Sequence, residues 1–439
     1  NEHDWAYNTD EKAFYIKTHA EDKIEVTTLK SGAIIKPGVN YVTIKEVAFE
    51  KFYSNGILLA KDASNINIQN CTLRNIVLVG IESKENTRNI TIANCTLKDI
   101  FGQGISVVEG NHVLIEHNNL KKIGLHSGYG IDGNNGGMGI IITNNEIRPE
   151  GYTSIAHNNT IRFNKVDSVG NYAIRMDGIQ SICEYNIVSN GLLTFNDGAL
   201  IYCWGMDSSF TNHNVIQHNL VTKSHGNLTG SPKSQLINVG IYIDNNVNNV
   251  IVRNNTITET QIGILFNSLS HSNKALNNVL YNNTSGICFS EYHQGYPIYG
   301  MEVKNNIIIG IGYDQRTIYS KSYVHNTLAP GIIDSNFHYN PKVDFLINSI
   351  TTFETFRRDE EMSLYEWQKR GFDKNGYTFS FDNLENNQKA YPEHLINYED
   401  SVREIIFENG NYYNTSGQPI KSIKIPPLSS AIVLRKPNN

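Results

Sequence analysis

The residues of this chain best suited to chemistry are aspartates set among aromatic side chains. Asp197 opens the segment Asp197-Gly-Ala-Leu-Ile-Tyr202-Cys-Trp204, and Asp244 closes the segment Gly240-Ile-Tyr-Ile-Asp244. Two carboxylates facing one sugar can act as proton donor and as nucleophile or base in the cleavage of a glycosidic bond. The structural alternative is that Asp197 forms an Asx turn and Asp244 bonds neighbouring backbone amides.

Asp244 ends one copy of a repeated frame, Gly-Ile followed by three residues, which recurs at Gly263 and Gly286 and in altered form at Ala173 and Leu200, the last of these just after Asp197. If each Ile points inward, strand alternation places the third and fifth positions on the outer surface. One outward column is then Arg175, Tyr202, Tyr242, Leu265 and Cys288, and the other is Asp177, Trp204, Asp244, Asn267 and Ser290. Acids beside aromatic rings are typical of a groove that binds sugars.

The sequence therefore predicts several substrate-binding residues beside the two aspartates. They are Asp177, Arg175, Tyr202, Trp204, Tyr242, His225, Glu291 and His293. Each has a structural alternative: Asp177 can pair with Arg175, the rings of Trp204 and Tyr242 can belong to the core, and the loop residues can stabilise turns. His126, Tyr129 and Asp132, in a glycine-rich stretch, are candidates for a further subsite.

A second repeated phrase supplies the scaffold that must position these residues. From about Val42 to Ile309, an aliphatic residue, two variable positions, Asn, one variable position and another aliphatic recur at intervals of about 19 to 36 residues. Such a unit cannot bury its apolar face alone and must stack on its neighbours. The clearest copies carry Asn118, Asn145, Asn164, Asn219, Asn255 and Asn306, and Cys71 and Cys95 take the same position. Coils about 4.8 Å apart would let these amides satisfy one another as a ladder.

This pattern resembles the right-handed parallel β-helix family of carbohydrate-active enzymes. The segments that carry Asp197 and Asp244 look like the paired motifs of β-helical glycoside hydrolases with fucosidase-like or xylan-directed activity. The resemblance implies an all-β solenoid with both aspartates at the catalytic cleft. Ala199-Leu200, and Asn267 one coil beyond Asp244, depart from the pattern of such relatives.

The periodicity also predicts the organisation of the chain. We expect a cap segment at 1–41 with a hairpin around the Asn8-Thr-Asp10 turn, a β-helix catalytic domain at 42–340 and an extension at 341–439. In the extension, Ser363-Leu-Tyr-Glu366 reads as the capping box of one short helix, and the last 40 residues alternate as strands. Insertions near 191–197 and 223–238 should form loops on the binding face.

The composition limits the kinds of partner that this protein can bind. The net charge of −6 is spread along the chain, so no basic field for nucleic acid is evident, and no apolar run approaches a bilayer span. Five scattered cysteines favour buried thiols over disulfides.

No cofactor is indicated, although Ca²⁺ occurs in β-helix lyases, and the oligomeric state is open. Residues 1–5 lack the features of a signal peptide, yet the resemblance implies a secreted, periplasmic or cell-surface protein.

Three functions fit these observations. The first is a glycoside hydrolase acting on a plant or algal polysaccharide or its oligosaccharides. A polysaccharide lyase is the alternative, with Arg175 or His225 as base, but an acidic groove would repel a polyanion. A non-catalytic carbohydrate-binding solenoid is the third, because the fold alone does not select a function.

Overall fold

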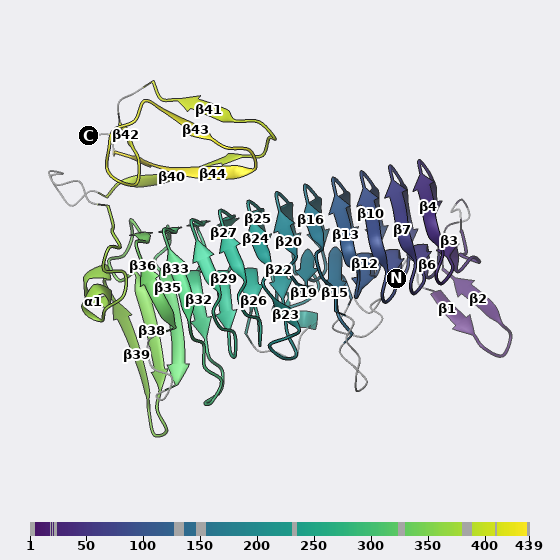
Figure 1. Ribbon diagram of the computed structural model, residues 1–439, viewed down its shortest axis with the longest axis horizontal. Helices are drawn as coiled ribbons and strands as arrows, with labels where there is room; N and C mark the ends of the chain where they lie inside the picture. The colour runs from purple at the N-terminus through teal and green to yellow at the C-terminus, as the bar shows by residue number, and fades with distance from the viewer. Residues whose placement is uncertain are drawn as a thin grey trace.

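A computed structural model describes residues 5–126 (apart from 18, 20, 22 and 23), 136–145, 155–230, 235–323, 330–379, 389–408 and 411–436. Over most of these ranges the chain winds into one elongated solenoid of parallel strands (Figure 1). The predicted all-β parallel β-helix is confirmed. Each complete coil contributes one strand to each of three long sheets, which we name PB1, PB2 and PB3.

PB1 is the sheet that carries the candidate site. Its strands are parallel until the last pair, β38 and β39, which is antiparallel. In sheet order they are β3 (Ser31–Ile35), β6 (Asn55–Leu59), β9 (Val79–Ser83), β12 (Gln103–Val108), β15 (Ile140–Thr143), β18 (Ile174–Met176), β22 (Gly198–Cys203), β26 (Asn238–Ile243), β29 (Ile262–Asn267), β32 (Ser285–Ser290), β35 (Arg316–Tyr323), β38 (Ile347–Thr352) and β39 (Arg357–Met362).

PB2 and PB3 complete the wall. PB2 contains β4 (Asn40–Lys45), β7 (Ser64–Gln69), β10 (Arg88–Ala93), β13 (Asn111–Glu116), β16 (Thr160–Arg162), β20 (Ile182–Glu184), β24 (Val215–Gln217), β27 (Ile251–Arg253), β30 (Lys274–Leu276), β33 (Met301–Lys304) and β36 (Gly331–Asp334). PB3 contains β5 (Ala48–Glu50), β8 (Thr72–Ile76), β11 (Thr96–Ile100), β14 (Asn119–Ile123), β17 (Lys165–Val169), β21 (Ile187–Gly191), β25 (Leu220–Ser224), β28 (Thr256–Thr258), β31 (Val279–Tyr281), β34 (Ile307–Ile309) and β37 (Phe337–Tyr339). A short pair, β19 (Gly178–Ile179) and β23 (Thr211–Asn212), lies beside PB2.

The interior follows from strand alternation. The Ile of each Gly-Ile frame, such as Ile241, Ile264 and Ile287, is fully buried in one continuous apolar core. The glycine before it lies against the next coil: a Cβ on Gly263 would meet the carbonyl oxygen of Gly286 at 2.5 Å. Glycine is therefore required there for backbones to approach closely.

An asparagine ladder runs between PB2 and PB3 along the inside of the coils. The Nδ2 of each side chain donates to the Oδ1 of the next at 2.9–3.1 Å, and the same oxygen accepts a backbone N–H from the coil before. Its members are Asn118, Asn164, Asn186, Asn219, Asn255, Asn278, Asn306 and Asn336, all with no more than 1% exposure. The predicted ladder is confirmed, with one correction. Asn145 follows β15 of PB1 and lies outside it, because Asn118 bonds Asn164 directly.

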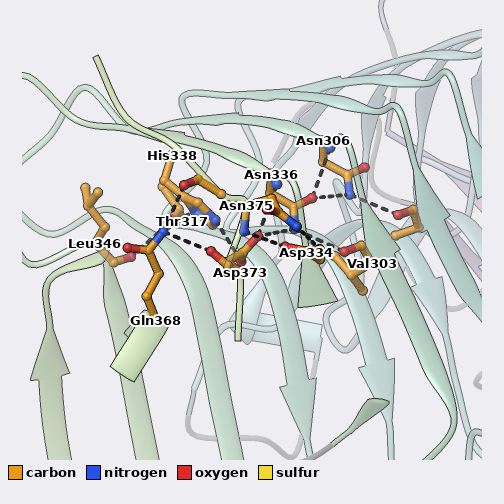
Figure 2. A network of polar contacts seen from close by, with 12 residues as sticks. Val303, Asn306, Thr317, Asp334, Asn336, His338, Leu346, Gln368, Asp373 and Asn375 are labelled. Carbon is orange, nitrogen blue, oxygen red and sulfur yellow. Dashed lines mark hydrogen bonds and ion pairs between the residues drawn. The ribbon is translucent and has the colours of Figure 1, made fainter. Parts of the chain in front are cut away.

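The ladder ends at a carboxylate. Asp373 Oδ1 accepts the backbone N–H and the Nδ2 of Asn336 at 3.1 and 2.8 Å, as Figure 2 shows. Asp373 Oδ2 lies 3.0 Å from His338 Nε2, whose Nδ1 lies 2.8 Å from the Thr317 hydroxyl (Figure 2). These three side chains resemble a catalytic triad in composition, but they are completely or almost completely buried. They provide hydrogen-bond partners for the last ladder residue and for one another at the end of the coils.

The ends of the chain carry small additions. The predicted hairpin is β1 (Trp5–Asn8) with β2 (Ala13–Ile16), and the predicted helix is α1 (Leu364–Lys369), whose capping box is present. Near the end of the solenoid that carries α1, a C-terminal unit lies alongside the coils (Figure 1). This unit contains β40 (Tyr391–Asn397), β41 (Arg403–Ile406), β42 (Tyr412–Tyr413), β43 (Ser422–Ile425) and β44 (Ser429–Arg435). It packs on PB3 through Ile432 and Leu434.

All five cysteines are buried and free, as predicted. Cys71 and Cys95 begin the ladder column, where the backbone N–H of Cys95 donates to Asn118 Oδ1 at 2.8 Å.

Replacing one central ladder amide should destabilise the protein. Asn219→Ala removes the acceptor of the backbone N–H and the Nδ2 of Asn186, and the donor to the Cys183 carbonyl. Each buried polar group left without a partner costs about 1–3 kcal/mol. We therefore expect a loss of about 3 kcal/mol or more in denaturant unfolding, against less than about 0.5 kcal/mol for Lys98→Ala on the exposed face of β11. Equal stability of the two variants would contradict a structural role for the ladder.

Candidate functional site

A cavity of about 850 Å³ opens on the outer face of PB1, across β22, β26, β29, β32 and β35. Its lining includes Phe195, Asn196 and Asp197 from one predicted insertion and Gln235, Leu236 and Ile237 from the other. The prediction that both insertions form loops on one face is thus confirmed. Cavities of this size and mixed polarity are typical of small-molecule sites.

The first predicted column crosses the floor of this cavity. Arg175, Tyr202, Tyr242, Leu265 and Cys288 pair in register from one strand to the next, as predicted. Tyr202, Tyr242, Leu265 and Cys288 line the cavity, whereas Arg175 lies one strand outside it.

Asp244 lies in the cavity directly after β26. Its Oδ2 accepts the Tyr202 hydroxyl at 2.7 Å, and its Oδ1 accepts Asn267 Nδ2 at 2.7 Å and the backbone N–H of Asn245 at 2.8 Å. Its residual exposure is 9%. Burial raises the pKa of Asp244 above its ordinary value, and the nearby negative charge of Asp197 adds to the effect, whereas the hydrogen bonds from Asn267, Tyr202 and Asn245 oppose it.

Asp197 reaches the same cavity from the loop before β22. Its backbone adopts a left-handed conformation, with φ of 59°, and its N–H donates to the Ile237 carbonyl at 2.9 Å. Asp tolerates this conformation better than most residues. The turn fixes Asp197 against the second insertion, and the side chain is partly exposed. A buried acid and a more open acid thus share one cavity.

Tyrosine rings surround the two acids. Tyr172 stacks on Tyr202, with centroids 4.3 Å apart, and Tyr202 meets Tyr242 edge to face at 5.4 Å. Burial raises the pKa of Tyr172 to about 12 and raises those of Tyr202 and Tyr242 well above 10. These hydroxyls therefore stay protonated at neutral pH and can serve as hydrogen-bond donors.

The lining residues that sequence reasoning missed include Tyr172, Tyr292, Tyr319 and Lys321. Tyr319 and Lys321 continue the two columns by one strand, because they pair with Cys288 and Ser290. The signal was present in the sequence, but in β35 Thr317-Ile318 replaces the Gly-Ile of the frame. Tyr172 and Tyr292 come from turns outside the frame, where alternation carries no information.

Asp177 and Arg175 form a buried ion pair in the wall, not part of the cavity. Arg175 Nε lies 2.7 Å from Asp177 Oδ2, which also accepts the Thr143 hydroxyl at 2.8 Å, while Asp177 Oδ1 accepts the Trp204 N–H at 3.0 Å. Burial opposes the charge of Arg175, but Asp177 outweighs it and raises the pKa of the guanidinium. Asp177 thus pairs with Arg175, which is the structural alternative to substrate binding that the sequence offered.

Trp204 also departs from its predicted place in the groove. Its ring packs edge to face on the buried Phe210, with centroids 5.3 Å apart, and the Arg175 guanidinium lies 5.8 Å from its centroid. Trp204 is absent from the lining of the cavity because the chain turns away after Cys203.

The three predicted loop residues lie outside the cavity lining. His225 is exposed, 3.3 Å from Asn190 Oδ1. Glu291 is buried and accepts the backbone N–H groups of Ile298 and Tyr323, so it holds a loop to β35. His293 is exposed, with its ring 4.7 Å from that of Tyr292. Of the further-subsite candidates, Tyr129 and Asp132 lie outside the described residues, and His126 contacts Phe101.

Within the described ranges, no group of three or more His, Cys, Asp or Glu side chains is arranged to hold a metal ion. The helices of the same ranges include none with the length and apolar character needed to cross a bilayer.

Solved structures with similar architecture share little sequence with this chain. The tailspike protein of E. coli bacteriophage HK620, in complex with a pentasaccharide, is 10% identical, with 93% of this chain and 87% of that chain covered and a TM-score of 0.42. An alginate lyase from Paenibacillus sp. is 12% identical over 62% of this chain and 98% of its own, with a TM-score of 0.37. The catalytic unit of an α-1,3-glucanase from Streptomyces thermodiastaticus is 9% identical over 79% and 63%, with a TM-score of 0.39. Similarities this distant carry no argument about function.

No curated protein matches the chain in sequence. The family described as the right-handed β-helix region matches at residues 11–147 and again at 80–231, which together span half of the chain. The stacked parallel sheets agree with that match. This chain therefore belongs to the right-handed β-helix family.

Proposed function

We propose that this protein is a glycoside hydrolase that cleaves a plant or algal polysaccharide or its oligosaccharides. The observation that carries the proposal is Asp244, a buried carboxyl with a raised pKa that shares a tyrosine-lined cavity with Asp197. Carboxyl groups whose environments separate their pKa values are suited to opposite roles in acid–base catalysis.

In this proposal Asp244 is the general acid. Burial raises the pKa of Asp244 and so favours its protonated form, and its proton passes to the glycosidic oxygen as the bond to the sugar breaks. Asp197, more open to solvent, is the partner that attacks the anomeric carbon or takes a proton from the attacking water.

The lining of the cavity favours hydrolysis over elimination. A lyase needs a base to remove the proton beside a uronic carboxylate and positive groups to neutralise that carboxylate. Lys321 is the only cation among the described lining residues, and the raised pKa values of Tyr202 and Tyr242 oppose their use as bases. The fucosidase-like or xylan-directed specificity, and a secreted, periplasmic or cell-surface location, are parts of the proposal that rest on the sequence resemblance.

Removal of either carboxylate should abolish turnover. We expect Asp244→Asn and Asp197→Asn to lower kcat/KM by about 100-fold or more in a screen of polysaccharides and aryl glycosides. Asp244→Asn should retain more activity on aryl glycosides with acidic leaving groups, which need no proton, whereas Asp197→Asn should lose both activities. Unchanged turnover in both variants would refute the assignment, and an unsaturated product absorbing in the ultraviolet would identify a lyase instead.

The Tyr202 hydroxyl should tune the acid. Its hydrogen bond lowers the pKa of Asp244, so Tyr202→Phe should raise that pKa further. Since a general acid works only while protonated, the alkaline limb of the kcat/KM profile should move to higher pH. Tyr319→Phe, which changes a lining ring without a bond to Asp244, is the matched control. An alkaline limb identical in all three proteins would exclude Asp244 as the acid.

Stability should separate Asp244 from the structural Asp177. Asp177→Asn leaves Arg175 charged and buried without its partner, which should cost about 3 kcal/mol or more in unfolding experiments. Because the folded pKa of Asp244 is raised, its contribution to stability is present below the unfolded pKa and is lost as pH rises through the folded value. Asp244→Asn should therefore be at least as stable as the parent at neutral pH. A similar loss in both variants would contradict this division of roles.

A further inference from the structure

The cavity has opposite charges at its two ends. Asp197 and Asp244 lie near β22 and β26, and Lys321 projects from β35. Between them on the second column, Asn267 donates a hydrogen bond to Asp244 and lies in register with Ser290 of the next strand. Ser290 lies in register with Lys321. Neighbouring strands lie about 4.8 Å apart, so Lys321 is about 14 Å from Asp244 along the floor.

Among the described residues, Lys321 has no counter-ion of its own. Its side chain forms no ion pair and no hydrogen bond with any described residue, although many surface lysines of this protein pair with acids. Its in-register neighbours in PB1, Ser290 and Ile350, are uncharged. The other lining residues around it, Cys288, Tyr292 and Tyr319, are also uncharged.

A half-buried ammonium group in a cavity is best matched by an anion supplied by the ligand. Lys321 is partly exposed, so its charge faces the cavity rather than the core. Seryl and tyrosyl hydroxyls beside it, from Ser290 and Tyr319, can donate hydrogen bonds to the same anion. The negative charge of Asp197 at the opposite end repels a negative group, so only one orientation of a charged glycan fits the field.

We infer that the substrate is an anionic glycan, with a carboxylate or sulfate on a sugar unit beyond the one cleaved, and that Lys321 recognises this group. The inference rests on the proposed glycosidase function of the same cavity. Lys321 is then a specificity-determining residue, and its ligand is an anionic group on the glycan. The cleaved unit itself, placed between Asp197 and Asp244, is expected to be uncharged.

Glycan binding to an inactive protein tests the inference without turnover. The probe is an array of neutral, uronate-bearing and sulfated plant and algal oligosaccharides, applied to Asp244→Asn. We expect binding of anionic members, weakened by added salt, and a loss of about tenfold or more in affinity when Lys321→Gln is added. Lys98→Gln, on PB3, is the matched control and should leave binding unchanged. Selectivity for uronate or for sulfate identifies the anion.

The possible failures are distinct. Binding of neutral oligosaccharides alone, or anionic binding that Lys321→Gln leaves unchanged, would overturn the inference and leave the glycosidase proposal intact. Absence of binding to every oligosaccharide, together with no hydrolysis by the parent protein, would overturn both. Melting curves of Lys321→Gln are expected to match those of its parent, because the side chain forms no ion pair or hydrogen bond with the described residues.

Discussion

The fold depends on one polar constraint, the need to satisfy buried backbone groups wherever the chain turns between PB2 and PB3. An asparagine amide meets it because it accepts through Oδ1 and donates through Nδ2 at the same time. From Asn118 to Asn336, each amide thereby links its own coil to the next. The apolar interior supplies most of the driving force, and the alternation of inward and outward side chains opposes a one-residue slip of any strand. The amides restrict the coils to one register.

Fixed register is what makes a site possible on this surface. Asp197 and Asp244 precede and follow neighbouring PB1 strands, and the pairing of Tyr202 with Tyr242 brings them into one cavity. The two insertions add Phe195, Asn196, Asp197, Gln235, Leu236 and Ile237 to the lining, so this part of a flat sheet becomes a hollow. Asp244 is almost fully buried there, and this burial raises its pKa above the ordinary value.

The sequence was most informative where a residue's role follows from strand period. The inward Ile positions, the outward column from Arg175 to Cys288 and the ladder amides were all predicted from alternation and repetition. The prediction for Asn145 was wrong although the phrase around it matches the repeat. The strand that precedes Asn145, β15, belongs to PB1, whereas the ladder residues follow strands of PB2, and the motif does not distinguish the two sheets. Asp177 and Trp204 were assigned to the groove because they occupy the fifth position of the frame. The contacts of Asp177 with Arg175 and of Trp204 with Phe210 hold these two side chains in the wall. Asp244 has the same position in its frame and lines the cavity, so the frame alone does not separate these cases. Tyr172 and Tyr292 lie on turns, and their approach to the cavity depends on tertiary packing that spacing does not encode.

Asp373 has a consequence for how such a chain can change. An amide ladder has no intrinsic end, since every new asparagine offers another donor to a further coil. A carboxylate in that position only accepts, and His338 occupies its second oxygen. Asp373 therefore ends the ladder without leaving a further amide donor that needs a partner. Whole coils could be gained or lost upstream by duplication or deletion while the terminus stays intact, which gives related chains a simple route to longer or shorter binding surfaces.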